Sequence, residues 1–281
     1  SEDFKAQEQL LFKAKEFGDD LDRALLKADG EPTYFAADTA YHQDKIERGF
    51  KHLILVLGAD HGGYIKRLQA LVKALSDGQV TCQVRVCQLV NLFKHGKAFR
   101  MSKRQGNFLT LREVLGELEP AILRFMMLTR RHDMVLDFDL AKAKEQSKDN
   151  PVFYVQYAHA RICSVFRKEG LASNQLALEQ IKPELLDHQE ELNLLKKINY
   201  YPEIIRQAAV NSEPHRLVFY LEELAAQLHS YWQLGRTSPE RRLLHDDQAC
   251  KTTRLALLAA TQKTLASGLA LIGVEALSEM S

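Results

Sequence analysis

The sequence predicts an α/β fold followed by an all-α bundle of antiparallel helices. A strand, a helix and a second strand are indicated in turn between residues 52 and 90. From residue 150 onward, apolar residues recur every three or four positions, which is the period of helices that bury one face. This change of pattern at Asn150 and Pro151 predicts one domain over residues 1–149 and a helical domain over residues 150–281.

Length, composition and charge limit the class of protein. The 281 residues suggest about two domains, and a hydrophobic content of 46% is enough for packed cores. Because the formal net charge is only +1, contact with a polyanion must come from local patches. No apolar run approaches the ~20 residues that span a bilayer, and the amino terminus shows no signal peptide, so we expect a cytoplasmic protein without membrane contact. The scattered cysteines, without a CxxC pair, predict free thiols and no metal site: they are Cys82, Cys87, Cys163 and Cys250.

The first half is predicted to contain a hairpin, two strands and a helix. The turn DGEP at residues 29–32 separates residues 23–28 from residues 32–35, which indicates the hairpin. Residues 52–59 predict a short buried strand, and residues 80–90 alternate well enough for another. The helix between them is marked by Ile65, Leu68, Val72 and Leu75. Such a unit forms a parallel sheet, in which ligands gather at the carboxyl ends of the strands.

A glycine-rich segment, GADHGGY, follows the first of these strands. Gly58, Gly62 and Gly63 would let the backbone approach a nucleotide closely, and Asp60 and His61 offer a carboxylate and an imidazole for a ribose or a base. A simple glycine-rich turn is an equally good interpretation of the segment alone.

The segment RMSKRQGN, residues 100–107, is strongly basic and precedes a helix that we expect to open at Thr110. The cations of this region are Lys94, Lys97, Arg100, Lys103 and Arg104, and the segment itself contains no acid. These ammonium and guanidinium groups could bind a polyanion together, and they would need to move little relative to one another to do so. A loop that grips phosphate and an exposed basic loop are both compatible with the charge pattern.

Tyr34, Asp38 and Tyr41 are spaced so that they share one face of a helix. A carboxylate beside phenol rings suits a guanidinium, because the planar fork pairs with the carboxylate and the ring attracts the cation. The same pattern also occurs on ordinary helix surfaces.

The second half opens with a helix that Asn150 caps, that begins at Pro151 and that ends at Gly170. Its apolar stripe consists of Val152, Val155, Ala158, Ile162 and Val165. Tyr154, Tyr157 and Arg161 lie on a neighbouring face, where rings beside an arginine suit an unpaired RNA loop. Core tyrosines are the competing interpretation.

Two later helices and one paired-carboxylate segment complete the pattern. One helix carries the stripe Leu217, Leu221, Leu224, Leu228 and Tyr231, followed by Trp232, and the other carries Leu255, Leu258, Leu265, Leu269 and Ile272. We expect about five or six helices in this half, with Trp232 either at a helix end or stacked on a base. Asp137 and Asp139 in LDFDL are interpreted as structural.

Several segments together resemble arginyl-tRNA synthetases, which are class I aminoacyl-tRNA synthetases. RMSKR is similar to the KMSKS signature of that class. The further segments are EFGDDLDRALLKADGEPTYFAADTAYHQDK, ERGFKHLILVLGADHGGYI, LDFDLAKAKEQSKDNP and NPVFYVQYAHARICSVF. The resemblance extends from Glu16 to the last residue and includes VEALSEM at the end.

The resemblance implies the second half of a Rossmann-type catalytic domain followed by a DALR-type anticodon-binding bundle, in a monomer without a prosthetic group. The intact enzyme would convert L-arginine and ATP–Mg²⁺ into arginyl-adenylate and then load tRNA-Arg. The implied catalytic residues are Lys103, Ser102 and Arg100. The implied ATP-binding residues are Gly58, Asp60, His61, Gly62, Met101 and Lys103. Tyr34 and Asp38 match the arginine-binding positions, and the implied tRNA-binding residues are Tyr154, Tyr157, Arg161, Trp232 and Met280.

The sequence departs from the family pattern at three places. Arg100 replaces the first lysine of the signature, Arg104 replaces its last serine, and Gly62 stands where many bacterial members have histidine. No HxGH string occurs, so half of the ATP clamp is missing and we expect the chain, a carboxy-terminal part of a longer enzyme, to be inactive alone. A non-catalytic tRNA-binding module and a purely structural protein are the alternatives.

Overall fold

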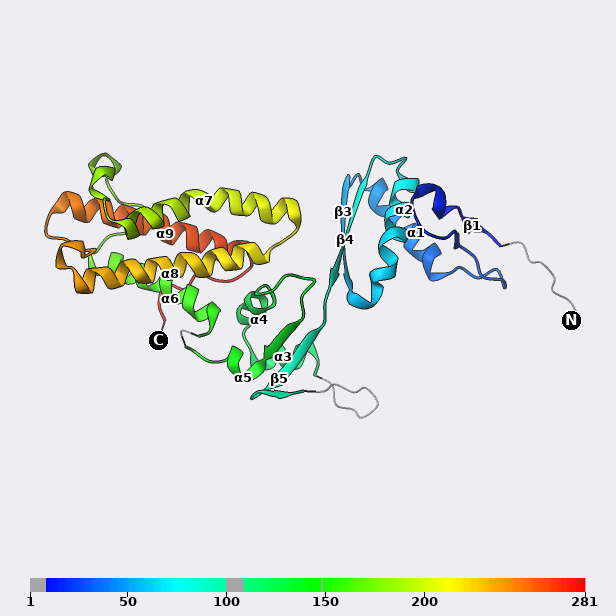
Figure 1. Ribbon diagram of the computed structural model, residues 1–281, viewed down its shortest axis with the longest axis horizontal. Coiled ribbons are helices and arrows are strands. Elements are labelled where there is room, and N and C mark those ends of the chain that lie inside the picture. The colour runs from blue at the N-terminus through cyan, green and yellow to red at the C-terminus, as the bar shows by residue number, and fades with distance from the viewer. Residues whose placement is uncertain (1–8, 100–108, 148, 281) are drawn as a thin grey trace, which may run out of the picture. The chain divides into compact units, whose positions relative to one another are not determined.

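The computed structural model describes residues 9–99, 109–147 and 149–280 (Figure 1). The chain forms two compact units. The first contains the residues up to Leu89 together with His132–Val135, and the second contains Val90–Arg131 and the residues from Leu136 onward. The predicted boundary at Asn150 divides the chain by secondary-structure pattern, whereas these units also group residues 90–131 with the helices, so that boundary stays a prediction.

The first unit begins with short elements that lead into a helix. β1 (Leu11–Phe12) pairs antiparallel with β2 (Arg23–Ala24), and η1 (Ala14–Phe17) lies between them. The hairpin predicted around DGEP is present as a turn, with an isolated bridge between Leu26 and Pro32. The strand predicted for its second arm is wrong beyond Thr33, because this side chain accepts a hydrogen bond from the Ala36 amide and caps α1 (Tyr34–Glu47).

The predicted strand–helix–strand unit is confirmed. β3 (His52–Gly58) and β4 (Thr81–Cys87) pair in parallel, and between them η2 (Ala59–Tyr64) leads into α2 (Ile65–Leu75). α2 packs along β4 (Figure 1). Leu53 of β3, Val72 of α2 and Val80 form a small core.

The strand predicted at residues 52–59 is present as β3, but the expectation that it is buried holds for one face only. Leu53 is 6% exposed, but Val56 is 67% and Ile54 is 49% exposed. Among the described residues the sheet has two strands, and alternate side chains of β3 point away from α2. One face of the strand is therefore uncovered.

The run predicted as one strand over residues 80–90 is divided between two sheets. β5 (Val90–Lys94) pairs antiparallel with β6 (Lys97–Ala98) and parallel with β7 (Leu136–Asp139). Asp137 accepts a hydrogen bond from the Asn91 amide group at 2.8 Å. Asp139 accepts from the Gly96 backbone at 2.7 Å and caps α5 (Leu140–Ala143). Both carboxylates thus have structural partners.

Strong local signals set the helices of the second unit. α3 (Leu111–Glu117) begins after Thr110, as predicted, because Thr110 and Glu113 form a reciprocal capping box. α4 (Pro120–Met127) begins at a proline. Asn150 Oδ1 accepts from the Val152 amide at 3.2 Å and caps α6 (Pro151–Lys168), which confirms the predicted start.

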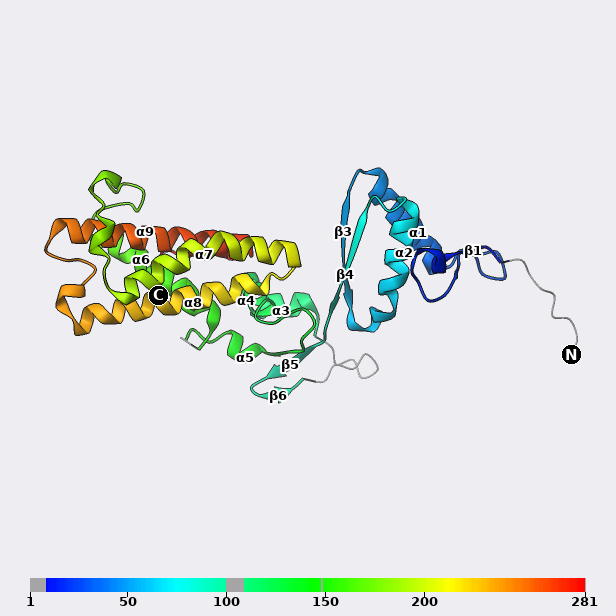
Figure 2. The ribbon, with the colours of Figure 1, turned by 45° about the horizontal axis from the view of Figure 1, so that its top comes forward.

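Four long helices and three short 3₁₀ turns form the described part of the chain from Pro151 to Met280. The long helices are α6, α7 (Gln189–Asn211), α8 (His215–Thr237) and α9 (Gln248–Leu271). The turns are η4 (Leu178–Gln180), η5 (Pro183–Leu185) and η6 (Pro239–Arg241). The expected five or six helices exceed the four long α-helices of this part; α7 alone has 23 residues and continues through Pro202. α7, α8 and α9 run side by side in both views (Figure 1, Figure 2).

The predicted apolar stripes form the core of this bundle. Every member is buried: Val152, Val155, Ala158, Ile162, Val165, Leu217, Leu221, Leu224, Leu228, Tyr231, Leu255, Leu258, Leu265, Leu269 and Ile272. α9 approaches α8 closely at Gly268, where a Cβ atom would lie 2.6 Å from Cδ2 of Leu221. None of the helices in the described ranges is both long and apolar enough to cross a lipid bilayer.

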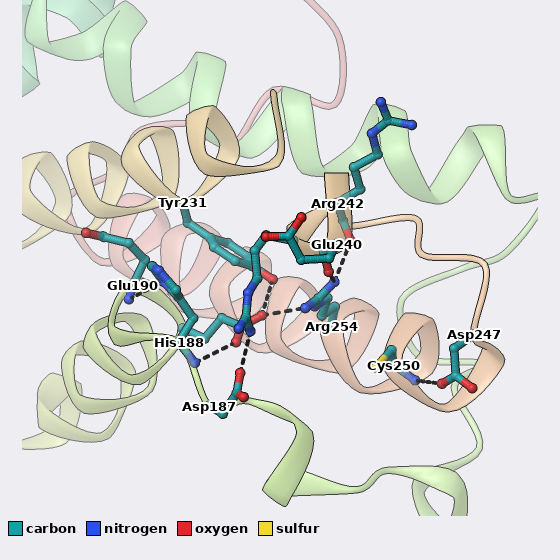
Figure 3. A network of polar contacts seen from close by, with 11 residues as sticks. Asp187, His188, Glu190, Tyr231, Glu240, Arg242, Asp247, Cys250 and Arg254 are labelled. Carbon is teal, nitrogen blue, oxygen red and sulfur yellow. Dashed lines mark hydrogen bonds and ion pairs between the residues drawn. The ribbon is translucent and has the colours of Figure 1, made fainter. Parts of the chain in front are cut away.

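A buried ion pair joins the helices of the bundle (Figure 3). Arg254 Nε of α9 lies 3.0 Å from Glu191 Oε1 of α7, and the two side chains are 3% and 0% exposed. Tyr231 of α8 donates to the same carboxylate oxygen at 2.9 Å. Arg254 Nη1 also donates to the carbonyl oxygens of Glu240 and Arg242, at 3.0 and 2.8 Å, so the pair also fixes the turn around η6.

Removing one member of this pair tests its contribution. Arg254→Met is expected to lower the free energy of unfolding by about 3–5 kcal/mol, because the Glu191 carboxylate would stay buried without a compensating charge. Urea unfolding followed by the fluorescence of Trp232, the only tryptophan, measures the change. Arg206→Met is the control, because Arg206 pairs with Glu203 at 2.6 Å on the exposed surface of α7, and its unfolding midpoint should barely change. Equal losses in the two variants would contradict the prediction.

Candidate functional site

A pocket of about 430 Å³ in the second unit contains several of the predicted site residues. Its lining residues are Gln146, Ser147, Phe153, Tyr154, Tyr157, His229 and Met280. Tyr154 and Tyr157 come from α6 and His229 comes from α8. We call this site the ring pocket, because aromatic side chains supply most of its wall.

The rings of the pocket are packed against one another and leave one face accessible. The His229 ring lies 4.8 Å from the Tyr154 ring, with a tilt of 57°, and 5.7 Å from the Tyr157 ring, with a tilt of 28°. Tyr157 is 50% exposed, which is unusual for a large ring in a helical core and suits it to contact a planar ligand. The core interpretation of the two tyrosines therefore fails for Tyr157.

Arg161 connects the ring pocket with Trp232. Its guanidinium carbon lies 4.0 Å from the centre of the Trp232 ring and 5.7 Å from that of Tyr157. Partial burial, together with the charge of Arg236, lowers the pKa of Arg161, but a guanidinium stays protonated. Trp232 lies near the carboxyl end of α8 (His215–Thr237), which agrees with the first alternative for this residue, and it packs there beside a cation. The second alternative, a base stacked on Trp232, stays a prediction.

His229 is a site residue that the sequence did not indicate. Its Nε2 is buried and has no hydrogen-bond partner within the described part of the chain. Burial, and next the charge of Arg161, lowers its pKa, so the ring is neutral at pH 7 and one nitrogen can accept a hydrogen bond. Its spacing of three from Trp232 on one helix is the signal that could have indicated it.

Met280 reaches the pocket because α6 holds the carboxy-terminal segment. Gln156 donates to the carbonyl oxygen of Glu275 at 3.0 Å, and His159 donates to that of Leu277 at 2.8 Å. Arg167 donates to Ser278 O at 3.0 Å. These bonds lay the last described residues along α6 and explain why a residue so near the end lines the pocket.

The predicted arginine-binding pair lies on α1 of the first unit. Tyr34 is 92% exposed, and Asp38 is partly exposed one turn further along the helix. The backbone oxygen of Asp38 accepts from Nδ1 of the buried His42 at 2.7 Å, which leaves the Asp38 carboxylate available. Tyr41 is engaged by Lys45, whose ammonium lies 3.9 Å from its ring centre.

The predicted nucleotide-binding residues follow β3, at its carboxyl end. Asp60 Oδ2 lies 3.4 Å from His61 Nε2. A Cβ atom on Gly58 would come within 2.7 Å of Asp60 Oδ1, so glycine is required while Asp60 keeps this position. At Gly62 a Cβ atom would meet nothing within 4 Å, so close packing does not explain that glycine.

The predicted catalytic residues Arg100, Ser102 and Lys103, and the predicted ATP-binding Met101, lie outside the described residues. Of the cations that precede them, Lys94 is less free than expected, because its ammonium lies 4.0 Å from Glu117, which also pairs with Lys144 at 2.8 Å. Lys144, and then Lys94, lowers the pKa of Glu117. No group of three or more metal-ligating side chains occurs within the described ranges.

The environment of His229 gives a testable titration. Its pKa is expected below the ordinary 6.5, and Arg161→Gln should raise it while leaving it below 6.5, because burial is the larger cause. Since the folded protein resists protonation of this ring, His229 should reduce stability as the pH falls from about 6.5 through its folded-state pKa. Histidine-selective NMR titration measures both pKa values, with His229→Gln to assign the signal. A value of 6.5 or more in the unmodified chain would contradict the expectation.

Comparison with known proteins identifies relatives for both parts of the chain. The DALR anticodon binding domain family matches residues 155–280. The arginine–tRNA ligase of Roseobacter denitrificans is 49% identical over 282 residues, which cover 99% of this chain and 49% of that protein. The arginine–tRNA ligase of Beijerinckia indica is 52% identical over 285 residues, which cover 99% of this chain and 48% of that protein.

Solved structures agree with the sequence relatives. A Campylobacter jejuni protein assigned as an arginyl-tRNA synthetase superposes with a TM-score of 0.81 at 29% identity, over 97% of this chain and 57% of that chain. The predicted fold class, an α/β part followed by a helical bundle, is thereby confirmed. The chain spans about half the length of the curated relatives it matches. Identity of about one half along nearly all of the chain, with a DALR domain in its helical part, shows that the chain belongs to the arginyl-tRNA synthetase family.

Proposed function

We propose that the helical part of this chain binds the anticodon loop of tRNA-Arg, as part of an arginine–tRNA ligase. The observation that carries this proposal is the ring pocket: Tyr157, His229 and Met280 line it, and all three lie within the stretch that matches the DALR family. Tyr154 lines it from just before that stretch. Arg161 and Trp232, beside the pocket, extend the same surface.

The chemistry of the ring pocket suits an unpaired base. The half-exposed Tyr157 ring offers a face for stacking, which is the usual way in which proteins hold a splayed-out RNA base. Neutral His229 can accept a hydrogen bond from a base edge through Nε2, whereas a charged imidazolium could only donate one. Arg161 supplies a fixed positive charge that favours the polyanion without closing the pocket.

For the intact enzyme we propose the two-step reaction of arginine–tRNA ligases. Arginine and ATP–Mg²⁺ would form arginyl-adenylate and pyrophosphate, and the terminal ribose of the tRNA would then take the arginyl group. Lys103 would follow the growing charge of the leaving pyrophosphate, with Arg100 and Ser102 in the same loop. Asp38 and Tyr34 would bind the arginine guanidinium by charge pairing and ring contact. Gly58, Asp60, His61, Gly62 and Met101 are the proposed ATP-binding residues.

A second function is a tRNA-binding module that performs no chemistry. The absence of an HxGH string from the 281 residues favours it for this chain taken alone. Both proposals share the helical tRNA site and differ only in the activation of arginine. A monomeric, cytoplasmic protein without a prosthetic group stays a prediction under either proposal.

Removal of one ring tests the tRNA site. Tyr157→Ala should weaken binding of tRNA-Arg by about 5- to 150-fold, because a stacked base contributes ~1–3 kcal/mol. Fluorescence anisotropy with labelled tRNA-Arg and with a non-cognate tRNA, at one fixed salt concentration, measures the loss. Tyr200→Ala is the matched control, since Tyr200 is similarly exposed at 47% but lies on α7 and does not line the pocket. If the two variants lose affinity equally, the ring pocket is not the RNA site.

An activity assay separates the two functions. The chain alone is expected to catalyse no arginine-dependent exchange of pyrophosphate into ATP, because one of the two ATP signatures of its class is missing from the sequence. A full-length arginine–tRNA ligase assayed in parallel is the positive control. Exchange by the chain alone would overturn this expectation and would exclude the purely binding function.

A further inference from the structure

A second pocket, of about 290 Å³, lies beside Trp232 and is strongly cationic. Lys168 of α6, Arg236 of α8 and Arg242 line it together with the Trp232 ring and Ser164. No aspartate or glutamate is among its lining residues. This concentration of positive charge stands out in a chain whose net charge is only +1.

The three cations have no acidic partner within the described part of the chain. Two acids that neighbour these cations along the chain or through Arg241 are engaged by other cations: Glu169 lies 3.1 Å from Lys251, and Asp187 pairs with Arg241. An anion that enters the pocket is therefore attracted by all three charges, without competition from an acid that lines it.

The buried network holds the backbone of this pocket in place. Arg254 donates to the carbonyl oxygens of Glu240 and Arg242, and Figure 3 shows the Arg242 side chain directed away from that network. At Gly235 a Cβ atom would lie 3.2 Å from the Arg242 Cα atom, so the turn rests directly on α8. The backbone at Arg242 is therefore held in place before any ligand binds, while the Arg242 guanidinium remains available to an anion.

The cationic pocket continues the ring pocket along α6 and α8. Tyr157, Arg161, Ser164 and Lys168 follow one another on α6 at spacings of three and four and therefore share one face. Lys168 follows Tyr157 by 11 positions, which on a helix is a rise of about 16 Å. Arg161 stacks on Trp232, which lines the cationic pocket, and lies next to Tyr157, which lines the ring pocket.

We propose that Lys168, Arg236 and Arg242 form a phosphate subsite that binds the backbone of the RNA strand whose base occupies the ring pocket. The inference rests on the proposed RNA binding and adds a second point of contact to it. Guanidinium groups bind phosphate oxygens through two parallel hydrogen bonds, and an ammonium adds a point charge. Phosphate contacts fix the position of a strand but do not discriminate between bases.

The test removes the three charges of the subsite together and compares the effect on RNA binding with the effect of removing three charges elsewhere. The subsite variant combines Lys168→Gln, Arg236→Gln and Arg242→Gln. The control combines Lys182→Gln, Lys196→Gln and Lys263→Gln, which are exposed lysines that line neither pocket and form no ion pair within the described ranges. Binding of the anticodon stem-loop of tRNA-Arg and of a non-cognate stem-loop is measured from 50 to 300 mM salt.

We expect the subsite variant to reduce the slope of log K against log salt concentration by about 1 and to weaken both stem-loops by the same factor. The control variant should keep the original slope. Circular dichroism and the unfolding midpoint establish whether both variants are folded. If the triple variant is not folded, the single variant Arg236→Gln replaces it, and a smaller reduction of the slope is then expected.

The outcomes separate the subsite from the proposed function. If the unmodified chain binds neither stem-loop, the proposed RNA binding and the subsite both fail. If it binds but the subsite and control variants have equal slopes, the subsite alone fails. Calorimetric titration with ATP in the absence of RNA tests whether a free nucleotide is the source of the phosphate. If ATP binds the unmodified chain in the millimolar range and this binding is lost only in the subsite variant, the assignment to an RNA backbone is overturned.

Discussion

The buried pair of Glu191 and Arg254 is the interaction on which both pockets depend. Two charges removed from water are tolerated only when their hydrogen bonds are complete, and here Tyr231, a backbone amide and two carbonyl oxygens complete them. A shift of α8 by one residue would break the bond from Tyr231. Since His229 and Trp232 flank Tyr231 in the sequence, the register that satisfies the buried carboxylate also sets the residues that line the pockets.

The parts of the fold that the sequence predicted depend on neighbours along the chain. Asn150 and Thr110 mark helix starts because each side chain caps an amide two or three residues away. The parts that it did not predict depend on distant packing. The exposure of Val56 follows from how many strands surround β3, and α7 continues through Pro202, where a proline ordinarily ends a helix.

The same distinction explains which site residues could be found. Tyr157 and Arg161 share a helix face, so their spacing was informative, whereas Trp232 and Met280 were indicated only by resemblance to a family. His229 was missed because its contact with Tyr154 joins residues 75 positions apart, through the packing of α6 on α8. The spacing from Trp232 could have placed His229 on the same helix face, but it does not show that the ring is neutral, since burial is what lowers its pKa.

A near-neutral chain with one cationic pocket is suited to discrimination between RNAs. Phosphates attract cations whatever the base sequence, so a uniformly basic surface would bind every tRNA tightly and reduce the share of affinity that depends on bases. With a net charge of +1, that unspecific attraction has to come from local groups of cations, of which the cationic pocket between α6 and α8 is one. Under the proposed function, the ring pocket, which has no charged lining residue while His229 is neutral, would supply the difference in affinity between one anticodon loop and another.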